Sequence, residues 1–238
     1  MPYCNAYLHK IFPNKHGEGN LFKLSHGFFS FSIVGEEEIR KNLEKRISVL
    51  ELLTNLDIKL FLSLNGLHSP FGDTLMPYFS RIVVWFPLYL FTVYLIFRKF
   101  RWKGFWVLLF IAMCVTLTDM LSFHAFKEVF HRLRPSYDPS LSHLVHMVGK
   151  KGGGLYGFVS SHAANVFGVA MFTSILLEKK WFTIIIFFWA FLVSYSRIYL
   201  GAHFPGDILG GAFLGMFVGW TVYWLQKILI DRLPPSKK

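Results

Sequence analysis

The sequence is short of acidic residues and of cysteine. Asp and Glu number 14 against 25 Lys and Arg, so the formal net charge is +11. The two cysteines, Cys4 near the N-terminus and Cys114 inside an apolar run, show no metal-ligand spacing, and we expect no disulfide between them. The start of the chain lacks the charged, apolar and small-residue order of a signal peptide. The absence of a basic helix with polar spacing and of any nucleic-acid-binding motif excludes nucleic acid as a partner.

Apolar residues are abundant, and they come in runs. Hydrophobic residues make up 53% of the chain and aromatic residues 18%, whereas a soluble domain has about 45–50% apolar residues. The runs predict an all-α fold, a polytopic membrane helix bundle of about five transmembrane helices. The last predicted helix carries Gly211, Gly215 and Gly219 at four-residue spacing, which favours close helix packing. The expected spans are about 76–97, 104–123, 157–177, 181–196 and 207–226.

The chain before the first span divides into two parts. Residues 1–47 are interpreted as a peripheral N-terminal extension, 48–230 as the membrane domain and 231–238 as a basic cytoplasmic tail. From Leu52 to Leu64 the leucines recur at helical spacing, which predicts an amphipathic helix in the membrane interface. A helix packed against other protein explains the same pattern, and both alternatives stay open.

Basic residues in the short connections give an orientation. If the spans alternate, three clusters fall on one side, which the positive-inside rule makes cytoplasmic. The opposite side then receives residues 124–156 and 197–206. The clusters are Arg98, Lys99, Arg101 and Lys103; Lys179 and Lys180; and Lys227, Arg232, Lys237 and Lys238.

Three cations are expected together on the opposite side. Lys127, Arg134 and Arg197 would repel one another without an anion between them, and guanidinium groups fit phosphate oxygens in bidentate fashion. Ser160 and Ser161 open the third span, where hydroxyls and free N–H groups of a helix N-terminus bind phosphate. These five residues predict a phosphate-binding pocket.

Two histidines supply the chemistry at the same face. His203 and Asp207 are one helical turn apart, so the carboxylate is expected to accept a hydrogen bond from the imidazole and fix its tautomer. A histidine so held attacks phosphorus, and His162 from another helix then protonates the leaving oxygen. Taken singly, each element has a structural explanation, but their common position favours a catalytic site. The excess of cations argues against a metal ion.

The stretches that carry these residues resemble the motifs of the type 2 phosphatidic acid phosphatase superfamily. Its pattern is a lysine, six residues and Arg-Pro; then Pro-Ser-Gly-His; then Ser-Arg, five residues, His, three residues and Asp. The first motif is matched by Lys127, Arg134 and Pro135, and the third by Ser196, Arg197, His203 and Asp207. The second is partial, because it keeps Ser160 and His162 but replaces the proline and glycine by Val159 and Ser161.

The resemblance covers about residues 50–230 and carries implications of its own. It implies an all-helical core, hydrolysis without a metal or other cofactor, and a phosphohistidine at His203. Many membrane members of the superfamily have six spans, against the five expected here. The stretches around residues 130–141 and 153–165 are also similar to a subgroup common in Bacteroides-like bacteria. The implied location is the bacterial inner membrane, with the active site facing the periplasm.

A lipid-borne phosphate is the expected substrate, because the pocket lies at helix ends near the headgroup region. Candidates are undecaprenyl diphosphate, a lipid A phosphate, phosphatidylglycerol phosphate and phosphatidic acid. The loop 136–156 offers His143, His146, Lys150 and Lys151 either as contacts to a second phosphate or sugar or as solvated residues. Asp119, late in the second span, is expected to partner a basic residue.

Two other functions stay open beside the lipid phosphatase. A vanadate-dependent haloperoxidase would use the same anion pocket, but those relatives are soluble. A non-catalytic lipid-phosphate carrier would need the pocket without the pair of His203 and Asp207. The oligomeric state is left open.

Overall fold

The computed structural model describes residues 33–149 and 153–231, and the regular structure in them is helical. One isolated bridge joins Leu133 to Tyr156. The predicted all-α fold class is therefore confirmed. The chain divides between Ser48 and Val49 into two units, of which the second contains the bundle. The domain bounds stay predictions, because most of the extension 1–47 and of the tail 231–238 lies outside the described residues.

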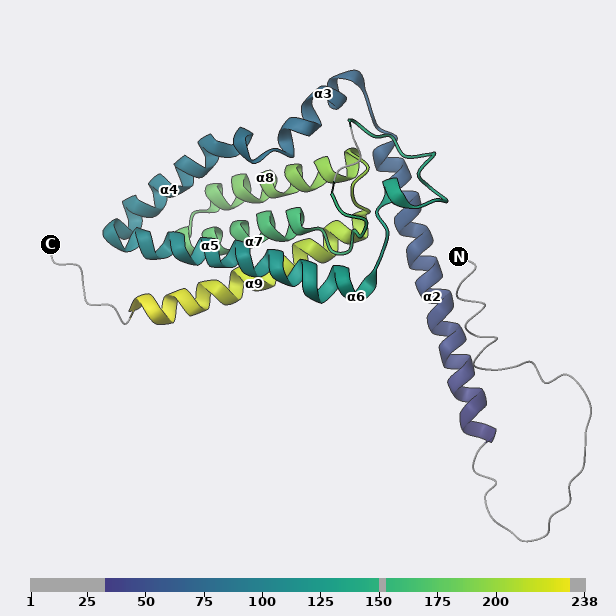
Figure 1. Ribbon diagram of the computed structural model, residues 1–238. Coiled ribbons are helices and arrows are strands. Elements are labelled where there is room, and N and C mark those ends of the chain that lie inside the picture. Colours follow the sequence, from purple (N-terminus) through teal and green to yellow (C-terminus); the bar gives the residue numbers. More distant parts are fainter. Residues whose placement is uncertain (1–32, 150–152, 232–238) are drawn as a thin grey trace, which may run out of the picture. The chain divides into compact units, whose positions relative to one another are not determined.

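Five helices lie side by side in the second unit (Figure 1). Each corresponds to one predicted span. They are α4 (Phe86–Phe100), α5 (Gly104–Met120), α7 (Ser161–Leu177), α8 (Lys180–Tyr199) and α9 (Pro205–Asp231). Three helical stretches are long and apolar enough to cross a membrane, and α7 is a shorter apolar helix. These stretches are Ile82–Phe130, which contains both α4 and α5, Lys180–Tyr199 and Pro205–Leu229. The protein is accordingly a multi-pass membrane protein.

The first two spans differ from their predicted bounds. Instead of one helix from residue 76, the chain forms α3 (Pro70–Phe79) and a short 3₁₀ helix, η1 (Ile82–Trp85), before α4 starts with a proline in its first turn. Beyond α5 the helix continues as a π-helical segment, η3 (Leu121–Lys127), and as α6 (Glu128–Phe130). This continuation carries Lys127 to the end of the bundle.

Glycines let α7 and α9 approach backbone to backbone, as the sequence predicts. A Cβ atom at Gly215 would lie 2.1 Å from the carbonyl oxygen of Ala164, and one at Gly219 would lie 2.3 Å from that of Gly168. Gly211 is equally restricted, with a backbone oxygen at 2.5 Å. No side chain fits at these positions, so the seam fixes the register of the two helices.

The predicted interfacial helix is part of a longer one, α2 (Ile33–Asn65). Its leucine stripe remains open: Leu52, Leu53, Leu56 and Leu60 are between 49% and 58% exposed, whereas Phe61 is fully buried. The stripe is therefore open as far as Leu60, whereas its end at Phe61 and Leu64 packs in a core cluster.

The end of α2 is attached to the bundle by one buried amide. Asn65 is 1% exposed, and its Nδ2 donates to the carbonyl oxygens of His146, Ile198 and Tyr199 at 3.0, 3.1 and 2.8 Å. Its Oδ1 accepts a hydrogen bond from the backbone N–H of His146 at 2.8 Å. One side chain thus joins α2, the loop after α6 and the last turn of α8.

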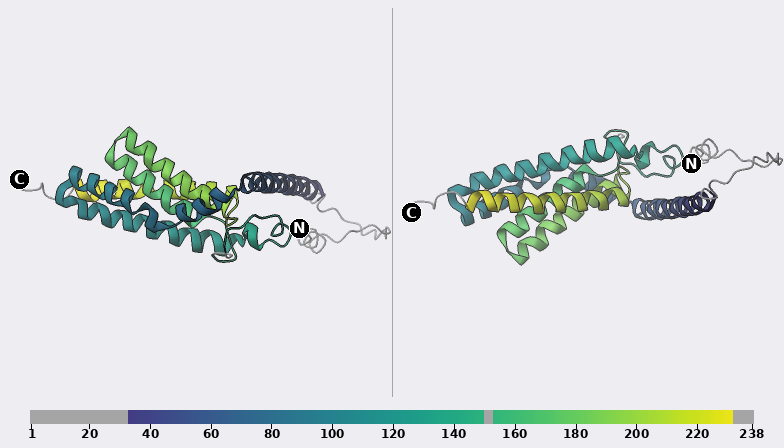
Figure 2. Two further views of the ribbon diagram at one scale, coloured as in Figure 1. Left: turned by 90° about the horizontal axis from the view of Figure 1, so that it is seen from above. Right: turned by 90° about the horizontal axis from the view of Figure 1, so that it is seen from below.

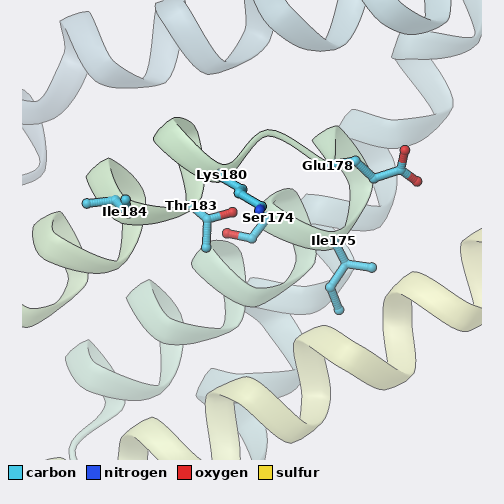
Figure 3. Close-up of a pocket in the computed structure, with 6 residues that line it drawn as sticks. All are labelled: Ser174, Ile175, Glu178, Lys180, Thr183 and Ile184. Atoms are coloured by element: carbon cyan, nitrogen blue, oxygen red, sulfur yellow. The ribbon is translucent and has the colours of Figure 1, made fainter.

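Two predicted cytoplasmic clusters lie at the other end of the bundle, where α4 meets α5 and α7 turns into α8. Of the third cluster, Lys227 lies in α9, and Arg232, Lys237 and Lys238 lie outside the described residues. In both views of Figure 2 this α7–α8 turn projects from one side of the bundle. Lys99 Nζ donates to the carbonyl oxygen of Leu176 at 2.7 Å and lies 3.4 Å from Glu178. Figure 3 shows six side chains that line a pocket at this turn. The pocket is lined by Ser174, Ile175, Glu178, Lys180, Thr183 and Ile184. None of these is a predicted site residue.

Candidate active site

The predicted site residues come together at one end of the bundle. The start of α7, the end of α8, the start of α9 and the segment after α6 all lie there (Figure 1). Arg134 interacts electrostatically with Lys127, Arg197, His162 and His203. Within the described ranges, no group of three His, Cys, Asp or Glu side chains is arranged to hold a metal ion.

The N-terminus of α7 begins with the two predicted serines. Ser160 is fully buried and caps the helix, its Oγ accepting from the backbone N–H of Ala163 at 3.5 Å. The Oγ of Ser161 lies 2.7 Å from Lys127 Nζ and 2.7 Å from Ser122 Oγ. The hydroxyl of Ser161 therefore holds the lysine in place at the helix end.

Arg134 is placed by a tight loop. Its side chain is 6% exposed, and its Nε donates to the carbonyl oxygen of Tyr156 at 3.2 Å. Gly153 has a φ of +81°, and a Cβ there would lie 2.7 Å from Arg134 Nη1, so only glycine leaves room for the guanidinium. Burial lowers the pKa of Arg134 below its ordinary value, and the negative charge of Asp207 opposes this shift.

Arg197, in the last turn of α8, has unused hydrogen-bonding capacity. Its Nη1 donates to Ser80 Oγ. Its buried Nε has no hydrogen-bond partner in the described part of the chain. A buried guanidinium with a free donor is well suited to an anion, since an unpaired buried donor is costly.

His203 and Asp207 are buried side by side, with 1% and 0% of their side chains exposed. His203 Nδ1 lies 3.5 Å from Asp207 Oδ2 and has no hydrogen-bond partner among the described residues, so the expected hydrogen bond is a near contact. Asp207 Oδ2 instead accepts from the N–H of Phe204 at 3.0 Å, as an acidic residue in the first turn of a helix commonly does. Burial lowers the pKa of His203 to about 4, although Asp207 opposes this shift.

Two residues that the sequence analysis did not assign complete the surroundings of Asp207. Arg132 Nη1 donates to Asp207 Oδ1 at 2.9 Å, and its Nη2 donates to Asp57 Oδ2 at 2.6 Å. Asp57 Oδ1 accepts from the backbone N–H of Gly206 at 2.7 Å. The guanidinium of Arg132 also lies over the ring of Phe204, 4.2 Å from its centroid. Arg132 lies within the first motif stretch, but the family pattern does not specify that position.

An apolar cavity of about 500 Å³ extends from the site between the helices. Ser161 and His162 line it beside apolar side chains of α4, α5 and α8, among them Trp189. Asp119 also lines it and interacts electrostatically with Lys127, in keeping with the predicted pairing of Asp119 with a basic residue. Two of its lining residues, Ser161 and Ser80, contact Lys127 and Arg197, so the apolar cavity adjoins these cations.

The loop after the first motif is partly anchored. His146 Nε2 lies 2.8 Å from Asp73 Oδ1, and its ring stacks on His68 with centroids 3.8 Å apart. A hydrogen bond from the Tyr199 hydroxyl, followed by the one with His146, lowers the pKa of Asp73. His143 is exposed, and Lys150 and Lys151 lie outside the described residues. His146 is therefore held by contacts within the protein, and both alternatives for the loop residues stay predictions.

A membrane helix bundle with three cations, two histidines and a carboxylate at one end defines the class of membrane lipid phosphatases. The family model of the PAP2 superfamily matches residues 103–231, and the chain belongs to this superfamily. It is 40% identical over 187 residues to a lipid A 4'-phosphatase of Bacteroides thetaiotaomicron, covering 78% of this chain and 83% of that protein. A lipid A 4'-phosphatase of Porphyromonas gingivalis is 35% identical over 73% of this chain and 74% of its own length.

A solved structure shares the fold. The PAP2-type phosphatidylglycerolphosphate phosphatase of Bacillus subtilis superposes with a TM-score of 0.54 at 24% identity, covering 78% of this chain and 90% of that one. The recognised resemblance and the predicted enzyme class are both confirmed: this protein is a membrane lipid phosphatase.

Proposed function

We propose that this protein removes a phosphate from the sugar headgroup of a lipid A-type molecule. The two relatives named lipid A 4'-phosphatases, at 40% and 35% identity, support this substrate class. The observation that supports it most is an apolar cavity of about 500 Å³ whose lining residues Ser161 and Ser80 contact Lys127 and Arg197. The phosphate binds at the cationic end, and the cavity receives apolar chains of the same molecule.

His203 is the nucleophile of the proposed reaction. Its Nδ1 faces Asp207, so Nε2 is free to attack phosphorus. The bond between phosphorus and the sugar oxygen breaks as the bond to nitrogen forms, and His162 donates its proton to that departing oxygen. Lys127, Arg134 and Arg197 stabilise the charge on the equatorial oxygens.

The second half of the reaction regenerates the enzyme. His162, now neutral, removes a proton from a water molecule that attacks the phosphohistidine. The bond between phosphorus and nitrogen breaks, inorganic phosphate leaves and His203 recovers its electron pair. Ser160 and Ser161 add hydrogen-bonding capacity at the start of α7, where N–H groups favour anions.

The proposed location is the bacterial inner membrane with the site at the periplasmic face. The basic clusters at the remote end of the bundle support this orientation. A Ser140→Cys variant is expected to react with a membrane-impermeant maleimide in intact spheroplasts. A Lys180→Cys variant is expected to react only after lysis, and the reverse pattern would overturn the orientation.

The function is tested by phosphate release from the full-length protein in detergent with a chelator present. The panel contains lipid A, undecaprenyl diphosphate, phosphatidylglycerol phosphate and phosphatidic acid. We expect lipid A to be the fastest substrate and His203→Ala to lose at least about 1,000-fold in kcat. His124→Ala is the matched control, because His124 is exposed and bonded only to Glu128 in the described structure. Faster release from another lipid would overturn the substrate assignment.

The carrier alternative is separated from the phosphatase by the same variants. Acid-labile label from a phosphate-labelled lipid should be trapped on the wild-type protein and be absent from His203→Ala, while lipid binding is retained. Hydrolysis that survives in His203→Ala would remove this histidine from the nucleophile role. Retained binding with no release by the wild-type protein would favour the carrier.

A further inference from the structure

The carboxylate of Asp207 is held from both of its oxygens. Oδ2 accepts from the N–H of Phe204 at 3.0 Å and lies 3.5 Å from His203 Nδ1, whereas Oδ1 accepts from Arg132 at 2.9 Å. Because Asp207 is fully buried, the position of its negative charge depends on these few contacts. Arg132 is the only cation bonded to it in the described structure.

Arg132 is in turn fixed from the other side by Asp57 of α2. The side chain of Asp57 is 15% exposed, and its Oδ2 lies 2.6 Å from Arg132 Nη2. Its Oδ1 accepts from Gly206, which carries the first free N–H of α9 because Pro205 has none. A Cβ at Gly206 would lie 2.7 Å from Asp57 Oδ2, so the glycine leaves room for this cap. A residue of α2 thus stabilises the start of the helix that carries Asp207.

Without this restraint, Asp207 would face competing cations. Lys127 and Arg134 both interact electrostatically with Asp207, and both belong to the phosphate-binding set. A carboxylate free to rotate toward them would take the place of a phosphate oxygen and leave His203 without its partner.

We infer that Arg132 and Asp57 form a positioning pair that holds Asp207 beside His203 and away from the phosphate-binding cations. This inference rests on the proposed phosphatase mechanism. It gives α2, which lies outside the matched family region, a direct part in the site. Neither residue touches the reacting atoms, so both act through Asp207.

The experiment measures steady-state kinetics of full-length variants in detergent on the best substrate of the panel. Arg132→Met removes both ion pairs. Arg132→Lys keeps the positive charge but lacks the two guanidinium nitrogens that bond Asp207 and Asp57 at the same time. Asp57→Ala removes the cap, whereas Asp57→Asn keeps an oxygen for Gly206. Lys59→Ala, an exposed position two residues further along α2, is the matched control. Thermal unfolding and elution volume check that each variant is folded.

We expect Arg132→Met and Asp57→Ala to lower kcat by about 10- to 100-fold, because a small displacement of a catalytic group has an effect of this size. Asp57→Asn and Arg132→Lys should retain more activity, and Lys59→Ala should equal the wild type. Vanadate should inhibit Arg132→Met more weakly, because Asp207 then competes for Lys127 and Arg134. Because the residues act as one unit, the double variant Arg132→Met/Asp57→Ala should be no slower than the slower single variant.

The pH dependence distinguishes positioning from a general loss of structure. His203 lies beside Asp207 and interacts electrostatically with Arg134, Arg197 and His162. Without Arg132, Asp207 turns toward Lys127 and Arg134, so protonated His203 loses the carboxylate that raises its pKa. The acid limb of kcat/KM should therefore move to lower pH in folded Arg132→Met and stay unchanged in Lys59→Ala.

The failure of this inference is distinguishable from failure of the proposed function. If His203→Ala is inactive while folded Arg132→Met and Asp57→Ala match the wild type in kcat, vanadate inhibition and pH profile, the positioning pair is refuted and the phosphatase mechanism stands. If the two single losses multiply in the double variant, the residues act independently and the pair is likewise refuted. If His203→Ala retains hydrolysis, the mechanism beneath both proposals fails.

Discussion

The two ends of the helix bundle use the same residue types in opposite ways. At the remote end, the side chains of Lys99 and Glu178 are 35% and 72% exposed, and their charges lie 3.4 Å apart near solvent. At the site end, Arg134, His203 and Asp207 are 6%, 1% and 0% exposed. The basic residues behind the net charge of +11 therefore differ in burial. Lys99 is partly exposed, as in a membrane anchor, whereas Arg134 is buried, as the proposed phosphate-binding role requires.

Removing one arginine from each end should give the largest contrast. Arg134→Ala is expected to lower kcat/KM by at least about 100-fold, because a preorganised buried cation stabilises transition-state charge strongly. Arg98→Ala at the remote, exposed end should change it less than about twofold. Phosphate release over a substrate series measures both. Equal losses at the two ends would contradict the division of roles.

The pH profile should reveal the buried histidine of the site end. In the proposed mechanism only neutral His203 attacks phosphorus, and burial lowers its pKa to about 4, so the neutral form persists to lower pH than for an exposed histidine. At pH 5 about nine-tenths of His203 is neutral, against about 3% for an ordinary histidine. The acid limb of kcat/KM should therefore lie well below pH 6. A limb near pH 6.5 would indicate a solvated nucleophile.

The glycine seam between α7 and α9 runs from the site end toward the remote end. Substitutions along it should distinguish a loss of stability from a loss of activity. A Cβ atom at Gly211 would meet the carbonyl oxygen of Ser160 at the site, whereas one at Gly219 would meet that of Gly168 further along α7. Alanine at either position should destabilise the fold by about 1–3 kcal/mol through overpacking. Only Gly211→Ala should also lower kcat in the folded fraction. Thermal unfolding and kinetics on the same samples distinguish the two effects.

The smallest effect is expected from the exposed ion pair at the remote end. Glu178→Ala should change stability by less than about 1 kcal/mol and leave kcat unaltered, because solvent screens the pair and Lys99 keeps its carbonyl partner. The unfolding temperature with and without added salt measures this. A loss of activity would show that the remote end takes part in catalysis.

Most of the fold and of the site composition follows from the sequence. Apolar runs of spanning length and the glycine spacing are local signals, so the five helices and the seam of α7 and α9 were predictable. The spacing of His203 and Asp207 likewise implied that both lie at one helix end. The first spanning stretch starts at Ile82 rather than at about residue 76, because α3 ends at Phe79 and a break in the helix separates it from η1.

The surroundings of Asp207 were not predictable in the same way. Asp57 and Gly206 are 149 residues apart, and no periodicity links a polar position on α2 to the first turn of α9. The hydrogen bond expected between His203 and Asp207 assumed a carboxylate without other partners. Arg132 and the N–H of Phe204 occupy it instead, and these contacts arise only when three distant segments pack together.

The buried amide of Asn65 also bears on how the protein ages. Asn followed by Gly, as in Asn65–Gly66, is the dipeptide most prone to deamidation, which requires the next backbone nitrogen to attack the side-chain carbonyl. Here the amide is fixed by four hydrogen bonds, and the N–H of Gly66 is itself bonded to the carbonyl oxygen of Leu62 at 2.9 Å. An aspartate at this position would turn a carboxylate toward three carbonyl oxygens. Deamidation at Asn65 should thus record past unfolding rather than elapsed time, which makes this residue a built-in marker of sample history.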